Sequence, residues 1–115
     1  MKIMISQPMN GKTNEQIKSE RENIVKRLHD MHIEVIDTVF DFEVQNVKNE
    51  PVFYLAKSIE KMSNADAVLF MNGWIEARGC RIEHEVARSY GIKILYENFI
   101  KNDTEVLTRN MIEDK

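Results

Sequence analysis

The segment ADAVLFMNGWIEARGCRIEHEVARSYGIKILY, residues 65–96, decides the fold. It opens with a nearly continuous apolar run at residues 65–71, which is typical of a parallel strand covered on both faces of a sheet. The loop at residues 72–74 ends that strand, residues 79–91 follow with helical spacing, and residues 92–96 form a second apolar run. A strand, a helix and another strand in this order predict a layered α/β domain with right-handed crossovers.

Glu83 is the most informative residue of this segment. At about 100° per residue, five residues of the helix share one stripe: Ile82, Val86, Tyr90, Glu83 and Ala87. The opposite side carries polar and charged residues: Arg81, His84, Glu85 and Arg88. A carboxylate within an apolar stripe needs a partner, and a nearby helix N-terminus stabilises an anion. Glu83 is therefore a candidate nucleophile or general base; the alternative is a structural acid that caps the helix or pairs with an arginine.

The beginning of the chain has the same alternation of strand and helix. Residues 2–6 form a short apolar run suited to a buried strand, and a turn-forming stretch follows at residues 7–11. Thr13 and Gln16 have the form of a capping box, which predicts a helix that extends to about Asp30.

The middle of the chain supplies the second strand, a loop and the second helix. Residues 33–36 predict the strand, and the mixed acidic and aromatic segment at residues 38–47 predicts a loop that either closes over a site or is a plain surface excursion. Pro51 is well placed to begin a helix. Its apolar residues are spaced three or four apart: Val52, Leu55, Ile59 and Met62. A weak helical pattern returns at residues 104–112.

These elements predict one domain over residues 1–115, a flavodoxin-like or Rossmann-like fold. Its doubly wound parallel sheet should have four to five strands flanked by helices. In such a sheet, ligands bind beyond the carboxyl ends of the strands, near the switch in strand order. The loops at these strand ends are residues 6–11, the segment after Ile36 and residues 72–79. Glu83 follows the third loop closely, so it should lie beside the same cleft.

The composition and the missing motifs restrict the possible functions. Sixteen basic and nineteen acidic residues give a formal charge of -3, which argues against duplex nucleic acid as a partner. No apolar run approaches the ~20 residues of a membrane span, and no signal peptide is visible. The single Cys80 indicates a reducing cytoplasm and is interpreted as a packing residue. The sequence has no dinucleotide fingerprint, no P-loop and no metal-ligand spacing among its histidines, so we expect no metal and no cofactor.

Two segments resemble the nucleoside 2-deoxyribosyltransferase superfamily, which includes the deoxynucleoside 5'-monophosphate N-glycosidases. KIMISQPMNGKT, residues 2–13, resembles the start of its small phage and bacterial members of unknown function. NADAVLFMNGWIEARGCRIEHEVARSYGIKIL, residues 64–95, resembles the family's strand, loop and helix, with Gly79, Glu83 and Ala87 in its register.

The resemblance implies a set of site residues. Glu83 matches the family's nucleophile, and Asp66 matches an acidic residue that helps to bind or protonate the base; from the pattern alone, Asp66 is equally a loop residue that ends the second helix. Eight residues are expected to bind the substrate: Ser6, Gln7, Pro8, Asn10, Gly73, Trp74, Arg78 and Gly79. In this interpretation Trp74 stacks on the base, unless it packs against the next loop, and Arg78 meets a 5'-phosphate.

The sequence departs from the family at two positions. Met4 stands where the first strand often carries a tyrosine that orients the nucleophile, and Ala77 stands where an acid holds the sugar hydroxyls, with Glu76 adjacent. We predict a cytoplasmic homo-oligomer, a dimer or larger, that transfers 2-deoxyribosyl groups or hydrolyses the N-glycosidic bond of a small nucleoside or nucleotide. Two alternatives remain. One is a non-catalytic module that binds or sequesters nucleotides, and the other is an interaction domain in which Glu83 is a satisfied buried acid.

Overall fold

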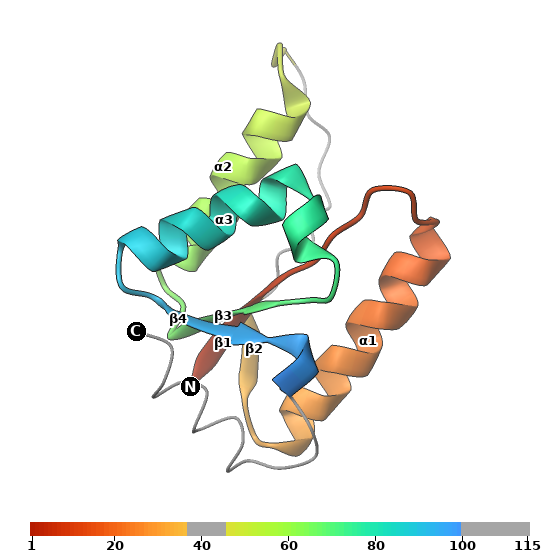
Figure 1. Cartoon of the computed structure of the whole chain (residues 1–115), viewed down its shortest axis with the longest axis vertical. Coiled ribbons are helices and arrows are strands. Elements are labelled where there is room, and N and C mark those ends of the chain that lie inside the picture. The colour runs from red at the N-terminus through yellow and green to blue at the C-terminus, as the bar shows by residue number, and fades with distance from the viewer. Residues whose placement is uncertain (37–45, 100–115) are drawn as a thin grey trace.

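The computed structural model of the protein describes residues 1–36 and 46–99 (Figure 1). Four parallel strands form the sheet: β1 (Lys2–Ser6), β2 (Glu34–Ile36), β3 (Ala67–Phe70) and β4 (Lys93–Tyr96). Their order across the sheet is β2-β1-β3-β4. The α-helices are α1 (Asn14–Asp30), α2 (Glu50–Met62) and α3 (Arg78–Ser89), and two short 3-10 helices are η1 (Trp74–Glu76) and η2 (Glu97–Phe99). The predicted α/β fold with a parallel sheet is confirmed.

Helices cover both faces of the sheet, as the doubly wound prediction requires. In Figure 1, α1 lies on one side of the strands, and α2 and α3 lie together on the other. Alternate residues of β1 divide between the two layers: Ile3 and Ile5 pack with Leu28 of α1, whereas Met4 packs with Ala87 of α3. All four residues of β3 are buried, which is the double coverage that its apolar run predicts.

The first helix begins where its capping box predicts. The Thr13 hydroxyl accepts a hydrogen bond from the Gln16 backbone N–H at 3.1 Å, and the Thr13 backbone N–H donates to Gln16 Oε1 at 2.9 Å. Both backbone N–H groups, which have no partner within the helix, therefore donate to side-chain oxygens. This reciprocal pairing fixes the direction of the chain as it enters α1. Pro51 likewise lies in the first turn of α2. Most of the predicted loop at residues 38–47, and all of the weak helical pattern at residues 104–112, lie outside the described residues.

The predicted buried stripe of α3 is wrong at two positions. Ile82 is 40% exposed and Tyr90 is 79% exposed, while the buried row consists of Cys80, Glu83 and Ala87. Residues three and four apart share a helical face, and the sequence offers two overlapping rows of this kind. The buried row contains two small residues, Cys80 and Ala87, which let α3 lie close to the sheet. His84, expected on the solvent side, is half-buried.

A similar correction applies to α2. Val52 is 59% exposed, whereas Met62 is buried, so the apolar row of this helix faces the sheet only toward its C-terminal end. The N-terminal half of α2 instead borders a cavity, described below. Among the described helices, none combines the length and the apolar character needed to cross a lipid bilayer.

Candidate active site

A cavity of about 660 Å³ lies beyond the carboxyl end of β1. Its walls come from the loop after β1, from α2 and from the beginning of α3. The chain leaves β1 toward β2 on one side, and β3 pairs with β1 on the other, so β1 borders the switch in strand order. The cavity therefore occupies the position at which an open parallel sheet binds ligands.

Glu83 lies in the wall of this cavity and is only 8% exposed. The Ser6 hydroxyl donates a hydrogen bond to Glu83 Oε1 at 2.6 Å. Burial raises the pKa of Glu83 above its usual range, and hydrogen bonding by the hydroxyl of Ser6, followed by that of Ser58 on α2, opposes the increase. The site thus holds an oriented carboxylate with two neighbouring hydroxyl groups.

Ser6 owes its position to strand pairing. It is the last residue of β1, it stands opposite Phe70 in the parallel ladder, and its carbonyl accepts from the Met71 backbone N–H at 3.0 Å. The residue is 2% exposed. Because pairing with β3 holds the Ser6 backbone in place, the fold directs the Ser6 hydroxyl at Glu83 of α3.

Cys80 lies one helical turn before Glu83 and also lines the cavity. Burial raises the pKa of the Cys80 thiol; a hydrogen bond with Ser6 acts in the opposite direction, and the charge of Glu83 adds to the increase. A thiol with a raised pKa is a poor nucleophile at neutral pH. The environment of Cys80 agrees with its interpretation as a packing residue.

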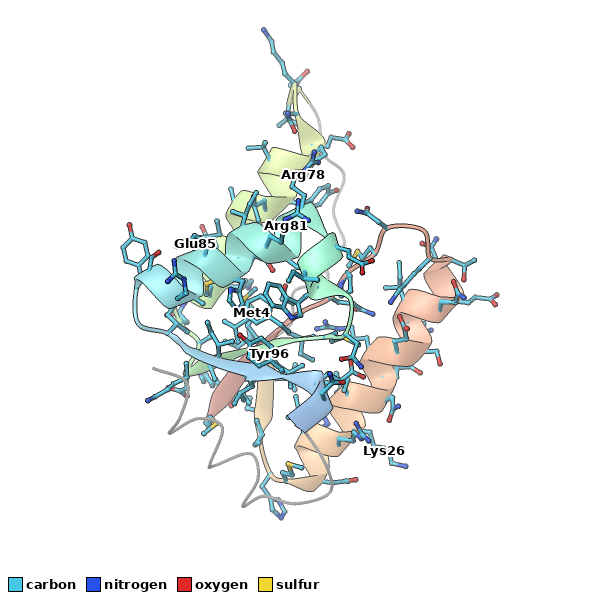
Figure 2. The ribbon with its side chains drawn as sticks, viewed as in Figure 1. Met4, Lys26, Arg78, Arg81, Glu85 and Tyr96 are labelled. Atoms are coloured by element: carbon cyan, nitrogen blue, oxygen red, sulfur yellow. The ribbon has the colours of Figure 1, made fainter. Side chains whose placement is uncertain are left out.

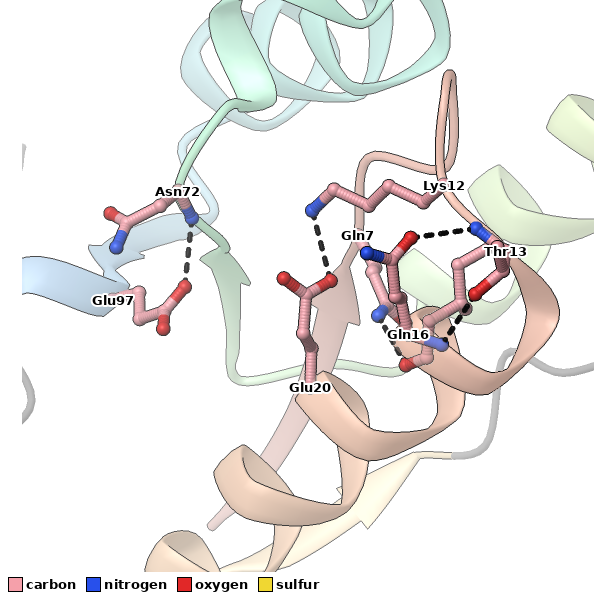
Figure 3. A network of polar contacts seen from close by, with 8 residues as sticks. Gln7, Lys12, Thr13, Gln16, Glu20, Asn72 and Glu97 are labelled. Carbon is pink, nitrogen blue, oxygen red and sulfur yellow. Dashed lines mark hydrogen bonds and ion pairs between the residues drawn. The ribbon is translucent and has the colours of Figure 1, made fainter.

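The loop after β1 is tied to α1 by side-chain contacts, shown in Figure 3. Gln7 Nε2 donates to the carbonyl of Ile17 at 2.7 Å, and Lys12 Nζ lies 2.9 Å from Glu20 Oε1. These contacts hold the loop against the first two turns of α1. Gln7 and Asn10, both predicted to bind the substrate, consequently line the cavity.

Cationic side chains gather on the same cavity. Arg78 and Arg81 project from the first turn of α3, as Figure 2 shows, and Arg21 reaches the cavity from α1. Arg81 Nη1 donates to the carbonyl of Ile75 at 3.0 Å, whereas the Arg78 guanidinium forms no hydrogen bond or ion pair with another described residue. The Arg78 guanidinium, beside a helix N-terminus, suits an anionic group such as a phosphate.

The structure does not bring Asp66 to this cavity. Its carboxylate accepts a hydrogen bond from the Lys2 backbone N–H at 2.7 Å, and its own N–H donates to the Lys2 carbonyl. Both residues stand at the amino ends of their strands. Four residues of β3 span about 13 Å, so Asp66, at the amino end of this strand, lies at the opposite end of the strands from Glu83. The expected role of Asp66 at the base conflicts with this geometry.

Three of the expected substrate-binding residues also lie away from the cavity wall: Pro8, Gly73 and Trp74. Pro8 is buried beside Gly73, whose φ of +91° forms the turn into η1. The Trp74 ring stacks on His84 with centroids 4.1 Å apart and an interplanar angle of 15°. Of the two interpretations of Trp74, packing against neighbouring protein is the one that the structure supports.

Sequence reasoning identified the remaining five binding candidates, Ser6, Gln7, Asn10, Arg78 and Gly79, and the structure places all of them on the cavity. It missed several other residues of the wall, among them Arg21, Tyr54, Ser58 and Glu76. A signal for two of them was present, because Tyr54 and Ser58 are four apart and so share a face of α2. Arg21 and Glu76 have no comparable periodic signal.

The fold and the site together define a doubly wound α/β domain with a buried carboxylate beside the strand-order switch. The sequence matches the family described as "Domain of unknown function (DUF4406)" over residues 1–96, and the chain belongs to that family. A comparison with curated proteins finds no match.

Among solved structures, the fold is similar to that of a 2-deoxyribosyltransferase from the psychrotolerant bacterium Bacillus psychrosaccharolyticus. The TM-score is 0.64 at 15% sequence identity, and the match covers 84% of this chain and 71% of that chain. That enzyme is described as a biocatalyst for the synthesis of antiviral and antitumoral nucleosides. The resemblance inferred from sequence is thereby confirmed at the level of the fold.

Proposed function

We propose that the protein cleaves the N-glycosidic bond of 2-deoxynucleosides or their 5'-monophosphates, with Glu83 as the nucleophile. The observation that carries the proposal is the hydrogen bond between Ser6 and Glu83 inside a cavity of about 660 Å³. A carboxylate that is buried, oriented and open to a ligand cavity has the properties of a catalytic nucleophile. The fold shared with a 2-deoxyribosyltransferase supports the choice of sugar.

In the first step, a carboxylate oxygen of Glu83 attacks the anomeric carbon while the bond to the base breaks. The transition state resembles an oxocarbenium ion, and the product is a covalent glycosyl-enzyme. Glu83 must be ionised for this step. Burial disfavours the ionised form and raises the pKa of Glu83, and the Ser6 hydroxyl opposes this increase by donating to Oε1, so Ser6 orients the nucleophile and favours its ionised form.

In the second step, water or another nucleobase attacks the same carbon and releases the sugar from Glu83. Water gives net hydrolysis, and a base gives net transfer. The cavity is large enough for either acceptor, since small-molecule sites commonly measure about 300–1,000 Å³. Its wall offers apolar surface from Ile5, Leu55 and Tyr54 to the sugar and base, and hydrogen-bonding groups from Gln7 and Asn10.

The arginines favour a 5'-monophosphate over the free nucleoside. Arg78 and Arg81 lie on the cavity within the first turn of α3, and the N-terminus of that helix adds a partial positive charge. Arg78 can provide two parallel hydrogen bonds to phosphate oxygens. We also propose a cytoplasmic location, which suits an enzyme of nucleotide metabolism.

The proposed assembly is a homo-oligomer, a dimer or larger. Three large apolar side chains on α2, on α3 and at the end of α3 are exposed, namely Val52, Ile82 and Tyr90. Burial of such groups against a second copy would remove apolar surface from water, and this would favour association. Light scattering coupled to size-exclusion chromatography measures the assembly, and a monomer at micromolar concentration would contradict this part of the proposal.

A non-catalytic module that binds or sequesters nucleotides is the second candidate. Two residues favour this candidate. Ala77 presents only a methyl group at the position where the nucleoside 2-deoxyribosyltransferase superfamily, which the sequence resembles, holds the sugar hydroxyls with an acid. Met4 is buried in the core and stands where that superfamily often carries a tyrosine that orients the nucleophile. This module would retain the cavity and its arginines and would bind nucleotides without turnover.

Base release distinguishes the two candidates. The protein is incubated with the four common 2-deoxynucleosides and their 5'-monophosphates, and free base is separated by chromatography. Release that is lost in Glu83→Gln supports the enzyme, and a deoxyribosyl group found by mass spectrometry on the peptide containing Glu83 identifies the nucleophile. Undiminished release by Glu83→Gln would remove Glu83 from that role. Nucleotide binding by calorimetry without base release would support the sequestering module.

A further inference from the structure

The proposed reaction needs a second acid, and the structure restricts which residue it is. As the glycosidic bond breaks, its electron pair moves onto a nitrogen of the base, and a proton delivered to the base stabilises the leaving group. Asp66 lies at the amino end of β3, at the opposite end of the strands from the cavity, where its carboxylate accepts a hydrogen bond from the Lys2 backbone N–H. Of the described residues that line the cavity, two carry carboxyl groups, Glu76 and Glu83.

We infer that Glu76 is the acid and base that exchanges a proton with the leaving base and the incoming water, an inference that rests on the proposed glycosidic cleavage. Glu76 ends η1 and lines the same cavity as Glu83. Within residues 1–36 and 46–99, its carboxyl group has neither a hydrogen-bond partner nor an ion-pair partner. It is therefore available to a ligand, whereas Oε1 of Glu83 already accepts a hydrogen bond from Ser6.

The backbone around Glu76 is fixed although its side chain is free. The Glu76 N–H donates to the Gly73 carbonyl at 3.1 Å, and the Ala77 N–H donates to the Trp74 carbonyl at 3.1 Å. Arg81 adds a side-chain hydrogen bond to the carbonyl of Ile75, which ties η1 to α3. This hydrogen-bonded turn thus presents an exposed carboxyl group to the cavity that also holds Glu83.

The environments of the two carboxyl groups suit two roles. Glu83 is buried and hydrogen-bonded, which suits a nucleophile of fixed orientation, and Glu76 is exposed, which lets it exchange protons with solvent between turnovers. Retaining glycosidases divide the work between two carboxyl groups in this way.

The proton and electron balance is complete without another reactant. In the first step, the bond between Glu83 and the anomeric carbon forms, the bond to the base breaks, and the Glu76 proton passes to the base. In the second step, water adds to the anomeric carbon, its proton returns to Glu76, and the electron pair of the ester bond returns to Glu83. The sum is base release by water, with both residues restored.

The test compares leaving groups that do and do not need a proton. Glu76→Gln is assayed with the preferred deoxynucleoside of the wild-type protein and with 7-methyl-2'-deoxyguanosine, whose base is already positively charged and leaves as a neutral molecule. We expect kcat for the preferred substrate to fall about 10²-fold or more, and release from the methylated substrate to change far less. The matched control is Glu60→Gln, an exposed glutamate of α2 away from the cavity, which should retain wild-type rates.

Equal losses on both substrates would overturn the inference and assign Glu76 to sugar binding, and an unchanged kcat would also overturn it. If the wild-type protein rejects the methylated substrate, added formate makes the same distinction. It should restore base release to Glu76→Ala by supplying a small carboxyl group in place of the deleted one, and the absence of any restoration would count against Glu76. Failure of the proposed function itself has a different signature, because the wild-type protein would then release no base from any deoxynucleoside.

Discussion

The Ser6 hydroxyl lies 2.6 Å from Glu83 Oε1, which links the last residue of β1 to the second turn of α3 across 77 positions of the sequence. The hydrogen bond is buried at both ends. Its geometry depends on the pairing of β1 with β3 and on the packing of α3 against the sheet, so the site forms only when both long-range arrangements are complete. Met4, two residues earlier, packs in the core and takes no part in orienting Glu83.

Removing the Ser6 hydroxyl should slow catalysis more than it weakens substrate binding. Ser6→Ala deletes a hydrogen bond to a charged group, worth about 1.5–3 kcal/mol, which corresponds to a loss in kcat of about tenfold to a hundredfold. The loss should also raise the pKa of Glu83 further, because a donor that stabilises the carboxylate is gone. The acid limb of the rate profile, measured as base release against pH, should therefore move to higher pH.

The conservative variant Ser6→Thr, which retains a hydroxyl group, should recover part of this rate. Ser89→Ala removes a hydroxyl that bonds only to the exposed Glu85 and serves as the control. A rise in KM with an unchanged kcat and pH profile would show that Ser6 contributes to the site without positioning Glu83.

Replacing Glu83 by glutamine should abolish base release and yet stabilise the fold at neutral pH. Burial raises the pKa of Glu83 in the folded protein, so the stability contributed by its bound proton is complete below the pKa of the unfolded chain and is lost as pH rises through the folded pKa. Glutamine is uncharged at every pH and can still accept from Ser6. Its gain in Tm should therefore be largest at about pH 7 and should shrink toward about pH 4. A gain in Tm that does not vary with pH would contradict this account.

The thiol of Cys80 should react slowly in the folded protein. Burial raises its pKa, so the thiolate is scarce at neutral pH, and the side chain is 5% exposed. Labelling with iodoacetamide, followed by mass spectrometry, should be much slower in buffer than in denaturant. Because Cys80 lines the cavity, a bound nucleotide should slow it further, and the labelled protein should release no base. Rapid labelling that a saturating nucleotide leaves unchanged would place the thiol outside the ligand site.

Local patterns in the sequence predicted those parts of the fold that depend on neighbouring residues. The capping box of Thr13, the start of α2 at Pro51 and the apolar run of β3 all act within one element, and each was placed correctly. The burial of α3 was predicted less well, since helical period leaves two adjacent rows to choose from. Packing of α3 against the sheet buries Cys80 and leaves Ile82 exposed.

The candidate site shows the same division. Glu83 could be found from sequence because a charge within an apolar stripe is locally conspicuous. Its partner Ser6 was expected only as a substrate-binding residue, because no local pattern reveals that a strand end and a distant helix meet. The misplacement of Asp66 has the same origin: periodicity identifies a strand, but the end at which ligands bind follows from the parallel arrangement of the whole sheet.

Two glycines near the site should respond in opposite ways to alanine. Gly73 has φ +91°, and its replacement should cost about 1–2 kcal/mol because a side chain disfavours this left-handed backbone, although the nearest atom to an added Cβ, Pro8 Cγ, lies at an ordinary 3.5 Å. Gly79 lies within α3, with open space around an added Cβ, and Gly79→Ala should stabilise by up to about 1 kcal/mol. Urea denaturation measures both. Equal destabilisation by the two substitutions would contradict backbone strain at Gly73 as the source of the difference.

Arg78 should decide whether the protein prefers a nucleotide to a nucleoside. Its guanidinium lines the cavity at the start of α3 and has no partner in the described part of the chain, so Arg78→Gln removes a phosphate contact without breaking an internal one. The loss of a charge-assisted hydrogen bond, about 1.5–3 kcal/mol, should raise KM for a deoxynucleoside 5'-monophosphate by about tenfold to a hundredfold and leave KM for the nucleoside nearly unchanged. Added salt should weaken the wild-type preference in the same direction, because the contact lies at the cavity rim. Arg88→Gln, which removes a cation that pairs with Glu85 on the outer face of α3, is the matched control. Equal increases in KM for both substrates would mean that Arg78 shapes the cavity without reading the phosphate.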